Sequence, residues 1–232
     1  MEISLSFILI SLLGLLATYL SGSVLYAIPI TRLVTGKDIR ELGNKNPGTS
    51  NVVRNVGKGW GFLVSFLDAF KVFLPLLLAR VFLFTADTDR DFAVLFLMGI
   101  AGVLGHCKPI FFRFKGGGGI GPLQGVLLFF IPVEYLVSML IGGTIVLLFL
   151  KKVKYKFGQW TPVMFVILTP FLTLLSTLLL DIPLFAHISI GGHSPSIVVG
   201  SFVLSLTILA LNMTFMRFRT RELKDGEHEE KG

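Results

Sequence analysis

The sequence predicts an all-α protein that crosses a membrane several times. It is 53% hydrophobic and only 15% charged, whereas soluble domains average roughly 25% charged residues. Apolar runs of about 20 residues recur along the chain, which is the length that a helix needs to cross a hydrocarbon core of about 30 Å. Membrane barrels instead consist of segments of about 10 residues with alternating polarity. The runs therefore favour helices.

Six apolar runs are candidate spans: residues 3–30, 61–84, 92–112, 120–150, 160–180 and 197–216. We expect the first to be a retained span, because Glu2 stands where a secretory signal carries positive charge and no Ala-x-Ala site follows. The run 120–150 has Pro132 and Glu134 near its middle. It is too short for two full perpendicular crossings at about 1.5 Å per residue, so it is either one span or two short ones.

The placement of positive charge favours two crossings in that run. Eighteen of the 21 Lys and Arg residues fall in four segments, 31–60, 108–115, 151–156 and 217–231. Basic loops stay cytoplasmic, and these four share one side only if 120–150 crosses twice. We therefore expect about seven spans, with the N-terminus outside and the C-terminus cytoplasmic. Residues 1–216 would form one transmembrane domain and residues 217–232 a cytoplasmic charged tail.

The same reasoning excludes several function classes. The net charge of +7 describes one face of a membrane protein, so we expect no nucleic-acid partner. Cys107 is the only cysteine and the four histidines lack ligand spacing, so we expect no metal and no cofactor. There is no Gly-x-Ser-x-Gly elbow and no His-x-x-x-x-Asp dyad. Any chemistry would rest on binding, orientation and charge stabilisation.

Two polar segments lie on the expected cytoplasmic face. Residues 36–61, "GKDIRELGNKNPGTSNVVRNVGKGWG", are rich in Gly, Asn, Ser and Thr and include Arg54. Backbone N–H groups, short polar side chains and a guanidinium suit a phosphate monoester, although Asn-Pro-Gly alone marks only a turn. Residues 113–122, "RFKGGGGIGP", do not have the spacing of a nucleotide P-loop. This glycine stretch is either a flexible hinge or a phosphate cradle.

Polar residues within the spans also raise alternatives. Asp68 and Lys71 are three residues apart, so they share a helix face and can pair. Ionisable groups at membrane depth usually face the protein interior, and the pair is either structural or shapes a site. His106 is either a base or a hydrogen-bonded structural residue.

Two regions of the chain resemble a known family, the bacterial acyl-phosphate:glycerol-3-phosphate acyltransferases. Residues 21–71 resemble the first conserved region, which runs Gly-Ser, Gly-x-Asp-Ile-Arg, Gly-Ser-Gly-Asn-x-Gly-Ala-Thr-Asn-x-x-Arg and Leu-Asp-x-x-Lys. Residues 104–121, "LGHCKPIFFRFKGGGGIG", resemble the second, Gly-His-x-x-Pro-x-Phe-x-x-Phe-Lys-Gly-Gly-Lys-Gly. The order and spacing agree over roughly the first 130 residues.

The resemblance implies a multi-pass enzyme of the cell inner membrane whose active face is cytoplasmic. It would transfer an acyl chain from acyl-phosphate to the 1-hydroxyl of glycerol 3-phosphate and make lysophosphatidic acid without coenzyme A or metal. Its partners would be these two substrates and membrane lipid. The resemblance implies catalytic roles for Asn51, Ser50 and His106. It implies substrate binding by Asn46, Gly48, Arg54, Lys115, Gly116, Gly117, Gly118, Gly119 and Arg217.

The sequence departs from the family pattern at several of these positions. Asn44 and Lys45 replace Ser-Gly, Gly118 stands where the family has a second lysine, and "FMRFR" keeps only Arg217 of the C-terminal motif Arg-His-Arg-x-Asn. An alternative is therefore a catalytically impaired member that binds a phosphorylated lipid or metabolite, or that scaffolds another membrane protein. A transporter is less favoured, because no paired half-helices or repeats are visible.

Overall fold

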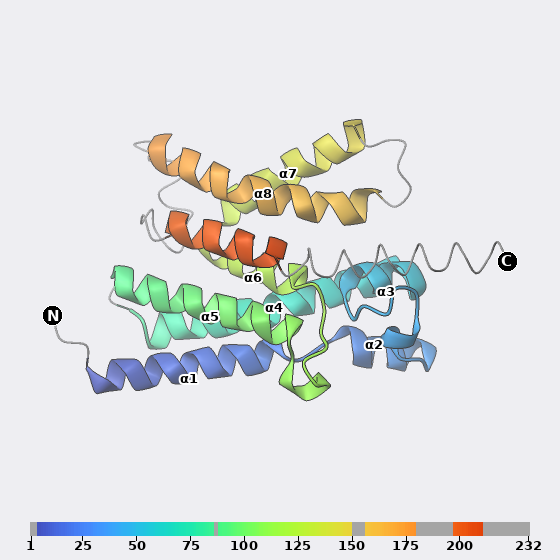
Figure 1. The fold of residues 1–232 in the computed structure, drawn as a ribbon, viewed down its shortest axis with the longest axis horizontal. Coiled ribbons are helices and arrows are strands. Elements are labelled where there is room, and N and C mark those ends of the chain that lie inside the picture. The colour runs from blue at the N-terminus through green and yellow to red at the C-terminus, as the bar shows by residue number, and fades with distance from the viewer. Residues whose placement is uncertain (1–3, 86–87, 150–155, 180–196, 211–232) are drawn as a thin grey trace.

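The computed structural model describes residues 4–85, 88–149, 156–179 and 197–210. Within these ranges all regular secondary structure is helical (Figure 1), which confirms the predicted all-α class. In chain order the helices are α1 (Leu5–Gly22), α2 (Ala27–Thr35), η1 (Ile39–Glu41), α3 (Thr49–Asn55), α4 (Lys58–Phe82), α5 (Asp89–Cys107), η2 (Ile110–Phe112), α6 (Ile120–Phe130), α7 (Pro132–Phe149), α8 (Lys156–Leu179) and a last helix, Ile197–Ala210.

The first predicted span, residues 3–30, corresponds to the apolar segment Leu5–Thr35, but this segment is not one continuous helix. Helix α1 ends at Gly22 and a separate helix, α2, begins at Ala27. Pro29 explains the break, because a proline ring clashes with the carbonyl four residues earlier and cannot extend a helix that comes from α1. The break turns the chain at Ser23–Tyr26, so α2 lies beyond the C-terminal end of α1 (Figure 1).

The run 120–150 is divided into two helices, as the charge pattern predicts. Helix α6 has 11 residues and α7 has 18. Pro132 begins α7, and the preceding Ile131 has left the helical conformation, as residues before proline usually do. At about 1.5 Å per residue, α6 is only half as long as the hydrocarbon core is thick.

Close approach of helix backbones holds α1 against α5. A Cβ at Gly22 would overlap the Gly102 carbonyl, and a Cβ at Gly105 would overlap the Tyr19 carbonyl. Small residues at such crossings are how membrane helices pack without a hydrophobic driving force between them. Helix α4 packs similarly along α6, and α7 along α8. The main core lies among α4, α5 and α6, where Phe96 stacks on Phe130 at a centroid distance of 3.9 Å.

Large apolar side chains also cover the outside of the bundle. Exposed examples lie on α1, α4 and α7: Leu5, Leu9, Leu12, Leu13, Leu16, Phe62, Phe66, Leu140, Leu147 and Phe149. Five described segments are long and apolar enough to cross a membrane, and two shorter apolar helices, Ile120–Phe130 and Ile197–Ala210, accompany them. The chain is a multi-pass membrane protein.

We predict that all seven apolar segments cross, with residues 31–60 inside the cell. Single cysteines at Lys37 and Thr85, both exposed, test this on a Cys107→Ser background. An impermeant thiol reagent added to intact cells should label position 85 and spare position 37, because α4 separates the two in the chain and is predicted to cross the membrane. Permeabilised cells should label both. Labelling at position 37 alone in intact cells would reverse the orientation.

Candidate functional site

The segment between α1 and α4 is a folded unit rather than a loose loop. Helix α2, η1 and α3 follow one another at one end of the bundle, to the right in Figure 1. They close over a small separate core of Leu25, Ala27, Ile28, Ile39, Val52 and Val64. The polar residues of the segment are therefore carried on a defined backbone.

Asn51 organises this segment from the inside. Its side chain is buried, and its amide nitrogen lies 3.2, 2.9 and 3.1 Å from the carbonyl oxygens of Ile39, Leu42 and Asn46. Its amide oxygen accepts a hydrogen bond from Asn55 at 2.7 Å. Both ends of the Asn51 amide are occupied by the chain itself. Its predicted contact with a substrate stays a prediction.

Asp38 is a second organiser, which the sequence analysis did not single out. The Arg40 guanidinium donates to both carboxylate oxygens at 3.0 and 2.7 Å, and Arg32 donates from α2. These guanidinium groups hold the pKa of Asp38 well below its usual range. Arg40 also lies over the Phe112 ring, 5.6 Å from its centroid. The first polar segment thus touches η2, which precedes the glycine stretch.

The other predicted residues of this segment lie on or next to α3. Ser50 and Arg54 are on the helix and exposed, and Asn46 and Gly48 precede it. The Asn46 side-chain oxygen is buried without a hydrogen-bond partner. Lys45 has φ of +59° at a position where the resembling family has glycine, so the turn keeps a left-handed conformation that a lysine adopts at some cost.

The glycine stretch lies against the end of α5 and is not a loose hinge. The Gly117 N–H donates to the His106 carbonyl at 3.0 Å. A Cβ at Gly116 would overlap that same carbonyl, and a Cβ at Gly117 would overlap the His106 imidazole at Nε2. A Cβ at Gly119, where φ is +79°, would crowd the Cys107 sulfur. At three of the four positions, therefore, close contacts leave no room for a side chain, and glycine is required.

The approach to the stretch is tightly turned and cationic. Arg113 and Phe114 both have positive φ, at 53° and 60°, and both are exposed together with Lys115. Gly118 is partly buried between two buried glycines. Arg217, the remaining predicted residue, lies outside the described residues, as does the charged tail.

A buried polar cluster joins the two segments beneath the surface. The predicted pairing of Asp68 with Lys71 is confirmed, with 2.6 Å between the ammonium and the carboxylate and both side chains almost fully buried. The Lys71 ammonium also lies 3.0 Å from His106 Nδ1 and donates to the Val24 carbonyl at 2.6 Å. His106 is thus a hydrogen-bonded residue of the interior. No group of three or more possible metal ligands occurs in the ranges that the structure describes.

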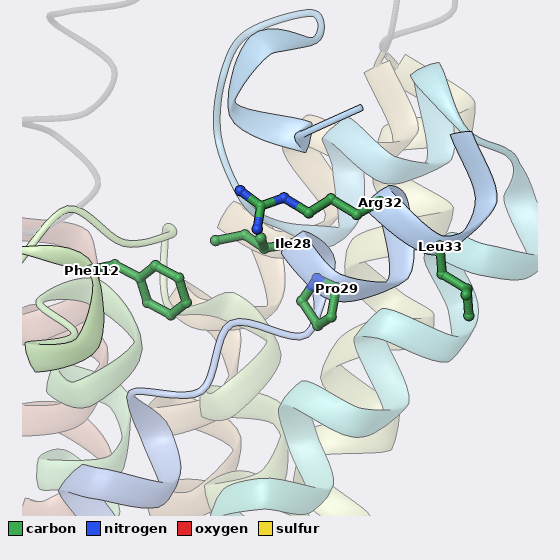
Figure 2. Close-up of a pocket in the computed structure, with 5 residues that line it drawn as sticks. All are labelled: Ile28, Pro29, Arg32, Leu33 and Phe112. Atoms are coloured by element: carbon green, nitrogen blue, oxygen red, sulfur yellow. The ribbon is translucent and has the colours of Figure 1, made fainter. Parts of the chain in front are cut away.

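An open groove lies between α2 and η2. Figure 2 shows Phe112 facing Ile28 and Pro29, with the Arg32 side chain extended above them and Leu33 further along α2. The lining is apolar except for Arg32. Charge patterning could not reveal this groove, because Phe112 on one wall is separated in sequence from Ile28 and Leu33 on the other by two long helices, α4 and α5.

Comparison with known proteins decides the family. The family profile described as "Glycerol-3-phosphate acyltransferase" matches residues 12–221. The chain belongs to the glycerol-3-phosphate acyltransferase family. Of its solved structures, the glycerol 3-phosphate form of the integral membrane enzyme PlsY (YgiH) is 30% identical and superposes with a TM-score of 0.61, covering 93% of this chain and 92% of that one. The lysophosphatidic acid form is 29% identical, with a TM-score of 0.62 and 90% and 92% coverage.

Curated family members match little more than half of this chain. The glycerol-3-phosphate acyltransferase of Mycoplasma mycoides is 39% identical over 137 residues, 59% of this chain and 51% of that protein. The corresponding protein of Aquifex aeolicus is 42% identical over 123 residues, 53% of this chain and 61% of that protein. The chain thus spans about half the length of the curated family members it matches.

Proposed function

We propose that the protein transfers an acyl chain from acyl-phosphate to the 1-hydroxyl of glycerol 3-phosphate, giving lysophosphatidic acid for phospholipid synthesis. The observation that carries this proposal is the meeting of the two family segments at one end of the bundle, through Arg40 on Phe112 and Lys71 on His106. The two solved structures are described as a glycerol 3-phosphate form and a lysophosphatidic acid form of that enzyme, which supports the same substrate and product here.

In the proposed reaction the substrate phosphate is held by Arg54, Lys115 and the glycine stretch Gly116–Gly119, in which the Gly117 N–H is not a phosphate donor because it is bonded to the His106 carbonyl. Ser50 orients the glycerol hydroxyl, and Asn46, Gly48 and Asn51 shape the turn that presents it. The hydroxyl oxygen attacks the acyl carbonyl carbon, the carbon–oxygen bond to phosphate breaks, and the leaving phosphate takes the hydroxyl proton. Orientation and charge stabilisation supply the catalysis.

We further propose that the acyl chain of the donor lies in the groove of Figure 2. Ile28, Leu33 and Phe112 offer apolar surface, and Arg32 places a cation at its rim. A ligand with an aliphatic tail and an anionic head matches that combination. The groove includes Phe112 of η2, and η2 precedes the glycine stretch in the chain.

Purified protein, acyl-phosphate and labelled glycerol 3-phosphate, scored for lysophosphatidic acid, test the proposed function. Product should form with acyl-phosphate, and acyl-coenzyme A serves as the comparison donor. Binding of glycerol 3-phosphate without any product, in monodisperse protein, would favour the catalytically impaired alternative. Gly118 in place of the second lysine is the observation behind that alternative.

Arg54→Ala should weaken binding of glycerol 3-phosphate by about 1.5–3 kcal/mol, the range for a hydrogen bond to a charged group. The fold should survive, because Arg54 is exposed on α3. Isothermal titration in detergent measures the change, and Lys58→Ala, an exposed cation at the start of α4, is the control. If Arg54→Ala binds as the parent protein does, Arg54 is not a phosphate ligand.

Gly118→Lys should strengthen phosphate binding and raise turnover, because it restores the family's second lysine beside the stretch. The added ammonium is repelled by Arg113 and Lys115. Near a surface this repulsion is only a few kcal/mol at an effective dielectric of about 20. A bound phosphate dianion outweighs it, because the anion attracts all three cations. Gly118→Ala, which adds a Cβ without charge, separates the backbone effect from the charge effect. Unchanged binding in monodisperse Gly118→Lys protein would argue against a phosphate cradle.

A further inference from the structure

The Lys71 ammonium is a fully occupied donor in the protein interior. Its nitrogen lies 2.6 Å from Asp68 Oδ1, 2.6 Å from the Val24 carbonyl oxygen and 3.0 Å from His106 Nδ1. An ammonium has three N–H donors and no acceptor, so each proton has one of these three atoms as its partner. Both Lys71 and Asp68 side chains are at most 2% exposed, so water does not substitute for any of them.

The third contact determines where the imidazole carries its proton. A neutral histidine has one donor nitrogen and one acceptor nitrogen, and the partner of one nitrogen fixes the role of the other. Because Nδ1 faces an ammonium, Nδ1 accepts and the proton sits on Nε2. If Nδ1 carried the proton, two donors, Nδ1–H and the Lys71 ammonium, would face each other at 3.0 Å without an acceptor. The Asp68 carboxylate does not compete, because it lies 3.7 Å from Nδ1.

The Nε2 side of the ring faces the glycine stretch. Any side chain at position 117 would overlap Nε2, and the neighbouring Gly117 N–H is itself bonded to the His106 carbonyl. The imidazole therefore touches the backbone that the proposed function assigns to phosphate. An Nε2–H at this place favours a bound anion, whereas an unprotonated Nε2 would repel one.

We propose that Lys71 is a positioning residue of this site, whose ammonium holds His106 as the Nε2–H tautomer and so directs a hydrogen-bond donor, not a base, at the glycine stretch. The catalytic part of this inference rests on the proposed function, while the tautomer does not. Lys71 contacts no substrate in this scheme. It acts through His106, and its partner Asp68 keeps the ammonium charged.

Nitrogen NMR of histidine-labelled, full-length protein in detergent measures the tautomer directly, and His106→Gln identifies the His106 signals among the four histidines. The parent protein should show a protonated Nε2 and an acceptor Nδ1. In Asp68→Leu/Lys71→Met the buried pair is replaced by apolar side chains, a change that proteins often tolerate. His106 should then become a mixture of tautomers. Ser21→Ala, which removes only the hydrogen bond to the Lys71 carbonyl, should keep the parent tautomer.

Kinetics separate positioning from a merely structural role. The double variant should raise the KM for glycerol 3-phosphate on the order of 100-fold, the scale of a misplaced binding group, and leave the KM for acyl-phosphate unchanged. Loss of folded protein would instead lower kcat and leave both KM values in place. Ser21→Ala should match the parent protein in both.

Three results would overturn the inference: an Nδ1–H tautomer in the parent protein, an unchanged tautomer in the double variant, or an unchanged KM for glycerol 3-phosphate in that variant. The first needs no variant, so it decides even if the double variant does not fold. If the parent protein makes no lysophosphatidic acid, the proposed function fails, and the nitrogen spectrum alone then decides the assignment of the tautomer.

Discussion

Gly117→Ala should abolish most acyl transfer and destabilise the protein by about 1–3 kcal/mol, the usual effect of forcing extra volume into a packed site. The added Cβ would overlap His106 Nε2, so either the imidazole or the glycine stretch must move. Movement of the stretch would also break the bond from the Gly117 N–H to the His106 carbonyl. Thermal unfolding in detergent and the acyl transfer assay measure the two effects.

Gly59→Ala is the matched control for this prediction. Gly59 lies in the first turn of α4 with nothing within 4 Å of an added Cβ. Alanine there should be neutral or stabilise the helix by up to about 1 kcal/mol, because alanine has the higher helix propensity. A Gly117→Ala protein as stable and active as the parent protein would show that the stretch does not lie on the imidazole.

Lys71→Met should lower the free energy of unfolding by about 3–5 kcal/mol, the usual effect of breaking a buried ion pair. The variant leaves the Asp68 carboxylate buried without its partner, and it removes the donor from the Val24 carbonyl as well. Asp68→Leu should have a similar effect for the opposite reason, since the ammonium is then left without its counter-charge. Denaturant or thermal unfolding of each single variant measures these losses.

The double variant Asp68→Leu/Lys71→Met should recover most of that stability, because neither charge then remains buried alone. Lys37→Met is the surface control, since Lys37 is exposed and such changes usually stay within about 0.5 kcal/mol. Single and double variants of equal stability would mean that Asp68 and Lys71 are not energetically coupled in the native state.

Much of the fold could be predicted because it depends on local features of the chain. Long apolar runs located α4, α5, α7 and α8, and Pro132 marked the division between α6 and α7. The pairing of Asp68 with Lys71 was readable because residues three apart share a helix face. Pro29 is the feature of the sequence that indicates the helix break after Gly22. The apolar run continues across the break, however, and therefore predicted a single span.

The candidate site was harder to predict, because its contacts join residues that are distant in sequence. His106 contacts Lys71, which lies 35 positions earlier in the chain. No periodicity in the sequence predicts such a contact. From the sequence, the glycine stretch could be either a hinge or a phosphate cradle. Three of its glycines are needed because they contact the end of α5, and the sequence does not show that contact. The family resemblance implied a catalytic role for Asn51, whereas its role in the turn depends on contacts with the carbonyls of Ile39, Leu42 and Asn46, which only the structure shows.

The three acceptors of Lys71 also bear on the order in which the protein assembles. During synthesis α1 and α4 emerge before α5, so the His106 acceptor becomes available last. Until then α4 would carry into the membrane an ammonium with one donor unsatisfied, which is unfavourable away from water. Stable integration of α4 therefore awaits both the end of α1, through Val24, and the arrival of α5. The contact that completes the buried polar cluster thus forms only after α5 has joined α1 and α4, so a protein arrested before that step should lack the proposed site.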